Sequence, residues 1–294
     1  MTAADAAVVE HSVYHEGARL HVLDYPGDEP AIVLMHGFLD DHRSYDKLVA
    51  VLPTRRVVTF DWLGYGRSDR SRRDGPSEDH GSELRAVLDG LGITRAVLVG
   101  HDASGPDAVA FALARPERVD HLVLLSTIFG HRPSLRLPEM IRLLADPGLG
   151  ALAEAMVGDD AQRLWLVRHT AAEWDEDALD PGGVTVRSIL PQFFGDADQP
   201  DAIAAIRAWT ARLFEALEAQ DALIESGALR SLEVAASVVS GEKDRYLSPM
   251  LGAEIAGLFE DASLHVVPGA AHWPQFDRAD LVAELLERCA AGTR

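Results

Sequence analysis

The sequence predicts an α/β fold: a mostly parallel sheet flanked by helices, with an inserted helical cap. Short apolar runs alternate with helical patterns over residues 19–127, and the same alternation returns over 233–289. The stretch between them is almost entirely helical in pattern. We therefore expect a core made of residues 1–128 and 233–294 and a cap made of residues 129–232.

The strands are predicted from apolar runs that end in turn residues. The first run, RLHVLDYP, is expected to lie antiparallel to its neighbour, and the later runs are expected to be buried and mostly parallel. In chain order the predicted strands are 19–26, 31–37, 56–61, 96–102, 120–127, 233–241 and 263–269. The predicted core helices are 80–92, 105–116, 248–259 and 278–289.

Composition limits the class of protein. A chain of 294 residues that is 47% hydrophobic can bury a sizeable core. It contains no apolar run of the length that spans a membrane, and its N-terminus does not read as a signal peptide. Cys289 is the single cysteine, which excludes an internal disulfide. Together these features predict a cytoplasmic location.

The formal net charge of −20 restricts the partners. An acidic surface repels nucleic acid and anionic membranes, so neither is expected as a partner. The expected partners are a small apolar substrate and water, and the sequence allows a homodimer. We expect neither a cofactor nor a metal.

Four motifs stand at the ends of the predicted strands. They are MHGF, FDWLGYGRSDR, GHDASG and the late pair SGEKD and GAAHW. In this order and spacing the chain resembles the α/β-hydrolase family over nearly all of its length outside the cap. The resemblance implies a nucleophile on a sharp strand-to-helix turn at GHDASG, followed along the chain by an acid and a histidine.

Asp102 occupies the nucleophile position, where enzymes with this pattern usually carry serine. The turn is crowded and requires small residues two positions before and two after the nucleophile. Gly100 and Ser104 meet this requirement around Asp102. With Ser104 as nucleophile, the residue two before it would be Asp102, which is not small. The other role open to Asp102 is that of a helix N-cap.

The remaining catalytic residues follow in the required order. Asp244 lies just past the strand 233–241 and His272 just past the strand 263–269. A carboxylate there can hold the imidazole in one tautomer and stabilise its cation. Glu242 is the nearest rival acid. The oxyanion site is expected from the backbone N–H groups of Phe38 and Ala103, the residue after the nucleophile.

An aspartate nucleophile changes the reaction. It attacks a saturated electrophilic carbon and forms an alkyl ester on Asp102, which water activated by His272 then hydrolyses. An ordinary ester or amide substrate would give an unproductive anhydride. The chain is therefore similar to the epoxide hydrolase and haloalkane dehalogenase branch of the family.

The two groups of enzymes differ in the residues that stabilise the leaving group. The HGF motif and the position of the acid Asp244 late in the chain are similar to those of epoxide hydrolases. Dehalogenases usually place a tryptophan where this chain has Ala103. The resemblance therefore favours an epoxide hydrolase acting on a small or medium apolar epoxide. A dehalogenase-like hydrolase, a cyclase or lyase, and a binding protein on the same scaffold are the alternatives.

Donors to the leaving group are expected from the cap. Epoxide hydrolases usually supply cap tyrosines, but none of the five tyrosines here lies in the inserted segment. The side chains predicted to replace them are those of Trp165, His169, Trp174 and Trp209.

Overall fold

The computed structural model describes residues 8–52, 54–70, 80–174 and 179–292. Within these residues eight strands form one sheet in the order β1-β2-β4-β3-β5-β6-β7-β8. β2 is antiparallel to β1 and β4, and all other neighbours pair in parallel. The strands are β1 (Val9–His15), β2 (Ala18–Tyr25), β3 (Asp28–Met35), β4 (Arg55–Phe60), β5 (Ala96–His101), β6 (Val119–Leu125), β7 (Ala236–Gly241) and β8 (Ala262–Val267).

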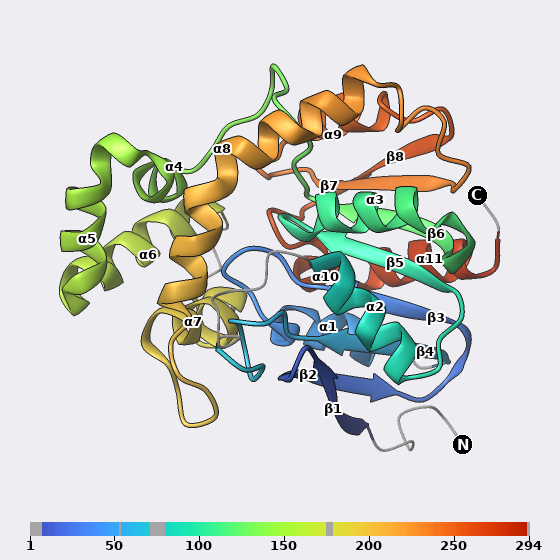
Figure 1. Cartoon of the computed structure of the whole chain (residues 1–294), viewed down its shortest axis with the longest axis horizontal. Coiled ribbons are helices and arrows are strands. Elements are labelled where there is room, and N and C mark those ends of the chain that lie inside the picture. The colour runs from blue at the N-terminus through green and yellow to red at the C-terminus, as the bar shows by residue number, and fades with distance from the viewer. Residues whose placement is uncertain (1–7, 53, 71–79, 175–178, 293–294) are drawn as a thin grey trace.

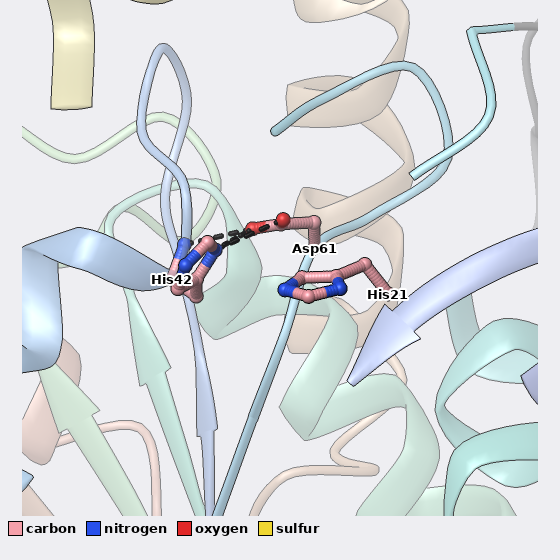
Figure 2. A group of neighbouring side chains, drawn as sticks. All are labelled: His21, His42 and Asp61. Atoms are coloured by element: carbon pink, nitrogen blue, oxygen red, sulfur yellow. Dashed lines mark hydrogen bonds and ion pairs between the residues drawn. The ribbon is translucent and has the colours of Figure 1, made fainter. Parts of the chain in front are cut away.

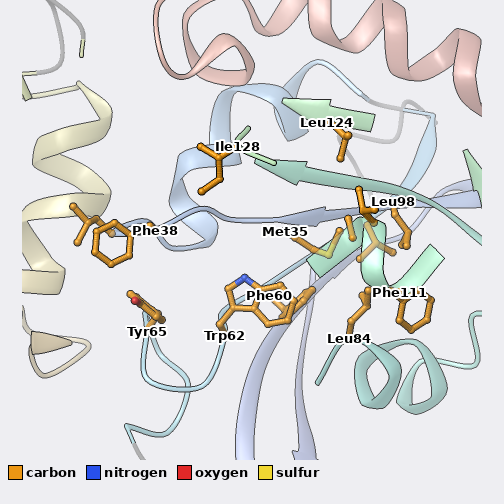
Figure 3. Packing of buried hydrophobic residues seen from close by; sticks show 14 of the residues in the cluster. Met35, Phe38, Phe60, Trp62, Tyr65, Leu84, Leu98, Phe111, Leu124 and Ile128 are labelled. Carbon is orange, nitrogen blue, oxygen red and sulfur yellow. The ribbon is translucent and has the colours of Figure 1, made fainter. Parts of the chain in front are cut away.

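Helices cover both faces of the sheet (Figure 1). Successive side chains of a strand point to opposite faces, so Val33 and Met35 join one apolar cluster and Ile32 and Leu34 the other. Figure 3 shows the first cluster, where strand residues lie beside Leu84 and Phe111. Its helices are α2 (His80–Gly90), α3 (Ser104–Ala114) and α9 (Pro249–Ala256). The second face carries α1 (Asp46–Ala50) and α11 (Ala279–Ala290), next to the short α10 (Pro274–Asp277).

The inserted segment lies beside one end of the sheet (Figure 1). Its Trp209 stacks on Phe38 after β3, and its Trp174 stacks on His272 after β8. The segment therefore covers the carboxyl ends of the strands, where open α/β sheets bind ligands. No helix of the described ranges has the length and apolar character needed to cross a membrane. The helices are α4 (Glu139–Ala145), α5 (Gly150–Gly158), α6 (Asp160–Trp174), α7 (Leu190–Phe194) and α8 (Ile203–Glu225).

The predicted fold class is confirmed, and one strand was not predicted. β1 forms a hairpin with β2 through Glu16 and Gly17, which both have positive φ. β1 is an edge strand that is mostly exposed or half-buried, so it lacks the continuous apolar run by which the other strands were recognised. The ends of the predicted core, residues 1–7 and 293–294, lie outside the described residues.

The turn after β5 is as crowded as the sequence predicts. A Cβ added to Gly100 would lie 2.8 Å from the Ser104 carbonyl oxygen and 2.9 Å from the Gly105 Cα. The Ser104 hydroxyl accepts a hydrogen bond from the His101 N–H at 2.9 Å and lies 2.8 Å from the Met35 carbonyl oxygen, to which it donates. Ser104 therefore has a structural role in the turn.

We expect Gly100→Ala to destabilise the protein by about 1–3 kcal/mol, because the added methyl group meets backbone atoms that cannot rotate away. Urea unfolding measures the difference. Gly158→Ala in α5 is the control, since its Cβ would meet nothing within 4 Å. Equal stability of the two variants would contradict the crowding described for this turn.

Candidate active site

Asp102 lies at the end of β5 in a backbone conformation that is uncommon for a residue with a side chain. Its φ is 51°. The Asp102 N–H donates to the Leu125 carbonyl oxygen at 3.0 Å, and the Asp102 carbonyl oxygen accepts from the Thr127 hydroxyl at 2.6 Å. Such a conformation persists where the surrounding structure enforces it, and it is frequent at active sites.

The loop after β3 contacts the Asp102 carboxylate. The Phe38 N–H donates to Asp102 Oδ2 at 3.0 Å. A Cβ on Gly37 would lie 2.7 Å from the Asp102 Cβ, so glycine permits this approach. Ala103 follows Asp102 and is the N-cap residue of α3. Within the described residues its N–H does not bind the Asp102 carboxylate.

His272 and Asp244 form a buried pair. His272 Nδ1 lies 2.9 Å from Asp244 Oδ2. Asp244 Oδ1 accepts from the N–H groups of Tyr246 at 3.0 Å and Leu247 at 2.9 Å, which fixes the carboxylate. The pair thus holds the proton on Nδ1 and leaves Nε2 available. The rival acid, Glu242, is exposed and accepts from the Gly269 N–H at 2.8 Å.

The charges of this pair stabilise one another. Burial opposes the imidazolium, but the charge and hydrogen bond of Asp244, followed by the charges of Asp102 and Asp40, raise the pKa of His272 to about 9. Burial likewise opposes the Asp244 carboxylate, but His272 and the two backbone N–H groups lower its pKa.

Asp102 is half-buried, and its partial removal from water is the main reason why its pKa is raised. The nearby charges of His272 and His101 and the hydrogen bond from Phe38 favour the ionised carboxylate. The Asp102 carboxylate and the His272 imidazolium therefore form an electrostatic pair across the site.

A second buried pair holds the elbow against the His272 loop. His101 Nε2 lies 3.0 Å from the His272 carbonyl oxygen, and His101 Nδ1 lies 3.2 Å from Asp40 Oδ2. The Trp273 indole N–H donates to the same Asp40 oxygen at 3.1 Å. Asp40 and Trp273 were missed, although Trp273 is the last residue of the motif GAAHW and Asp40 lies two residues after MHGF.

Two cavities adjoin the elbow. The inner one has a volume of about 30 Å³, which is room for about one water molecule. Asp102 and His272 are among the residues that line it. The outer one has about 290 Å³ and borders Ala103, and the two share Ile128 and Trp209. None of the described residues that line the inner cavity is Arg or Lys. They are Phe38, Asp102, Ile128, Leu137, Pro138, Ile141, Trp174, Trp209, Tyr246, Leu247, His272 and Trp273.

Two of the four predicted cap side chains reach the site. Trp174 and Trp209 line the inner cavity. Trp165 is 57% exposed and stacks on His169 with ring centroids 5.1 Å apart, so neither reaches it. Residues 165 and 169 are one turn apart on the outer face of α6, whereas residue 174 lies on the opposite face. The prediction for Trp165 and His169 is therefore wrong.

Two tyrosines of the core segments adjoin the cavities, and the sequence analysis missed both. Tyr246 lines the inner cavity, and its hydroxyl donates to Glu139 Oε2 at 2.9 Å. Tyr65 lines the outer cavity. The sequence could have indicated them, because Tyr246 lies two residues after Asp244 and Tyr65 lies in the GYG turn after β4.

A further buried cluster joins His21, His42 and Asp61 (Figure 2). Their potential metal-binding atoms lie within 4.8 Å of one another. However, the Asp61 carboxylate already accepts from the His42 ring at 2.9 Å and from the N–H groups of His42 and Arg67, both at 2.8 Å. Burial opposes both charges, but their attraction raises the pKa of His42 and holds that of Asp61 well below its usual range. The cluster acts as an ion pair that braces two loops.

Residues 30–279 match the α/β-hydrolase fold family, and the chain belongs to that family. It is 30% identical over 289 residues to a 2-hydroxy-6-oxononadienedioate/2-hydroxy-6-oxononatrienedioate hydrolase of Burkholderia vietnamiensis, covering 92% of this chain and 91% of that one. A meta-cleavage product hydrolase from Pseudomonas fluorescens has a TM-score of 0.73 at 22% identity, over 96% of this chain and 97% of that one.

An epoxide hydrolase, CorEH, has a TM-score of 0.75 at 18% identity, over 98% of this chain and 100% of that one. This likeness shows the fold alone. The comparisons thus support a hydrolase of this fold. They do not support the epoxide hydrolase and dehalogenase branch that the sequence analysis favours, because these relatives are named as hydrolases of other substrates.

The electrostatic pairing predicts that Asp102→Asn lowers the pKa of His272 below about 9, because the substitution removes one of the charges that stabilise the cation. NMR titration of the imidazole measures the change, with His272→Gln to assign the signal. A raised pKa stabilises the fold fully below the ordinary value of 6.5, and this contribution is lost as the pH rises through about 9.

Asp120→Asn is the matched control, since Asp120 pairs with Arg95 away from the site. An unchanged His272 pKa in Asp102→Asn would show that the two charges do not interact.

Proposed function

We propose that the protein is a hydrolase in which Asp102 is a nucleophile that forms a covalent alkyl ester. The observation that carries the proposal is a carboxylate at the strand-to-helix elbow, with its Oδ2 bound by the Phe38 N–H and His272 in the same cavity. Asp102 is followed by a helix, but as a capping residue it would not need the buried His272–Asp244 pair opposite it.

In the first step, a carboxylate oxygen of Asp102 attacks a saturated carbon of the substrate. The bond from that carbon to the leaving atom breaks, and its electron pair stays with the leaving atom. When the substrate is an epoxide, the leaving atom is the ring oxygen, which remains attached to the product and takes up a proton.

In the second step, His272 Nε2 takes a proton from water, and the hydroxide attacks the carboxyl carbon of the ester. The oxyanion then forms on Asp102, within reach of the Phe38 N–H and, in our proposal, the Ala103 N–H. Its collapse breaks the ester bond, and the released alkoxide takes the proton from His272. One oxygen of Asp102 is thereby replaced by an oxygen from water.

The change of charge at Asp102 connects the two steps. The ionised carboxylate helps to keep His272 protonated, because its charge is among the causes of the raised His272 pKa. Esterification removes that charge, so the His272 pKa falls and the imidazolium releases its proton, through water, to the alkoxide left by the first step. Only then is the imidazole a base.

We propose an apolar epoxide as the substrate. The inner cavity is lined mainly by apolar and aromatic side chains, and the outer cavity has room for an apolar body. A haloalkane is the alternative electrophile, although Ala103 offers no side-chain donor for a halide.

The relatives suggest a second candidate, hydrolysis of a carbon–carbon bond in a 2-hydroxy-6-oxo dienedioate. The sequence identity over most of the chain favours it. A dienedioate carries two carboxylates. No Arg or Lys is among the described residues that line the inner cavity, which speaks against it, although Arg212 borders the outer cavity. Asp102 at the elbow also speaks against it, because a carboxylate attacking a carbonyl group would give an anhydride.

His272→Gln tests the ester mechanism. Loss of the base blocks the second step, so intact mass measurement should show the protein plus one whole substrate after exposure to a terminal alkyl epoxide. After exposure to a haloalkane it should show the protein plus the alkyl group, with the halide released, and a dienedioate should give no alkyl ester. The probe that forms the adduct identifies the class of electrophile. In ¹⁸O-labelled water the wild-type protein should carry label in the peptide that contains Asp102.

Asp102→Asn in the same background is the control and should form no adduct. If wild-type protein turns over a probe while His272→Gln forms no adduct and Asp102 takes up no label, the ester mechanism is wrong.

The two cap tryptophans that line the inner cavity are the remaining cap donors. We expect Trp174→Phe or Trp209→Phe to lower kcat at least about tenfold, about 1.4 kcal/mol in the barrier, since phenylalanine fills most of the space but donates no hydrogen bond. Trp165→Phe is the matched control because Trp165 lies outside the cavity. Turnover near wild type in all three variants would exclude a cap tryptophan as donor.

A further inference from the structure

The Tyr65 hydroxyl is buried and has no hydrogen-bond partner among the described residues. Tyr65 is 5% exposed and lies in the turn after β4. A buried hydroxyl without a partner costs free energy, so such groups are uncommon unless a ligand or water completes them.

The position of Tyr65 connects it with the elbow. It lines the outer cavity together with Ala103, the residue after the nucleophile. Figure 3 shows its hydroxyl end on the side of Phe38, whose N–H binds the Asp102 carboxylate. Asp102 also lies close enough for its charge to add to burial in raising the pKa of Tyr65 well above its usual range. The phenol therefore stays protonated and is a donor.

The turn that carries Tyr65 is held rigidly. The ring packs edge-on against His36 with centroids 5.6 Å apart. The Asp61 carboxylate, paired with His42 (Figure 2), binds the Arg67 N–H at 2.8 Å just beyond Tyr65. The Gly66 N–H donates to Gln192 Oε1 at 3.2 Å, which ties the turn to the cap segment. These contacts fix the hydroxyl without satisfying it.

Other side-chain donors that the core segments place near the elbow are already used. The Tyr246 hydroxyl donates to Glu139, and the Trp273 indole donates to Asp40. Ala103 has no side-chain donor. On the core side of the site, the Tyr65 hydroxyl is therefore the donor to which a ligand can offer an acceptor atom.

We propose that the Tyr65 hydroxyl donates a hydrogen bond to the oxygen that leaves the attacked carbon when Asp102 forms its ester. This inference rests on the proposed function. As the carbon–oxygen bond of the epoxide breaks, its electron pair stays on the ring oxygen, and the Tyr65 O–H stabilises that developing alkoxide. The tyrosine keeps its proton. The alkoxide takes a proton from water, and that proton is replaced by the one that His272 releases once the ester has formed.

Tyr65→Phe tests the proposal in the His272→Gln background. The probe is 1,2-epoxyoctane, and mass spectrometry follows the rate of ester formation. Removing the hydroxyl should slow ester formation at least about tenfold, because the leaving oxygen loses its donor. With His272 intact, breakdown of the ester in Tyr65→Phe should stay within about twofold of wild type, because the hydroxyl acts only in the first step. A merely structural residue would not separate the two steps in this way.

Tyr45→Phe is the matched control. The Tyr45 hydroxyl is also buried but donates to the Met35 carbonyl oxygen at 2.7 Å. Its loss should lower the Tm and leave ester formation unchanged, whereas Tyr65→Phe should keep or raise the Tm.

The outcomes separate the two proposals. Ester formation at equal rates with and without the Tyr65 hydroxyl overturns the role of Tyr65 and leaves the ester mechanism standing. Absence of any ester in His272→Gln while the wild type turns over the epoxide overturns the proposed function itself.

Discussion

The geometry of the site depends on one backbone constraint, the left-handed conformation of Asp102 at the end of β5. This conformation turns the chain sharply enough to lift the carboxylate out of the sheet and to start α3 at once. Gly37, Gly100 and Ser104 are small because the backbone of this turn touches its neighbours. Phe38 and His272 can act on the Asp102 carboxylate only because this turn places it between them.

The charges around His272 can change its protonation state. His272 and Asp244 are buried and Asp102 is half-buried, and a charge removed from water is tolerated when an opposite charge lies beside it. The imidazolium has a carboxylate on either side, one held by backbone N–H groups and one free to react. In the proposed mechanism, formation of the ester removes the negative charge of Asp102 and lowers the proton affinity of His272, so the charges would set the order of the two steps.

The sequence predicted the parallel core and the elbow because buried strands read as apolar runs and the motifs stand at their ends. It missed β1, whose alternating polar residues belong to an edge. It placed Trp165 and His169 wrongly because it did not assign the faces of α6. The unpaired hydroxyl of Tyr65 depends on contacts between segments far apart in the chain, which no local pattern encodes. The branch suggested by the Asp102 motif and the branch suggested by overall identity differ, because one residue can change the reaction while the rest of the chain changes little.

Phe38 joins two parts of the protein. Its N–H aims the Asp102 carboxylate, and its ring stacks on Trp209 of the cap segment with centroids 4.1 Å apart. Because one residue makes both contacts, the packing of the inserted segment is mechanically linked to the orientation of the Asp102 carboxylate.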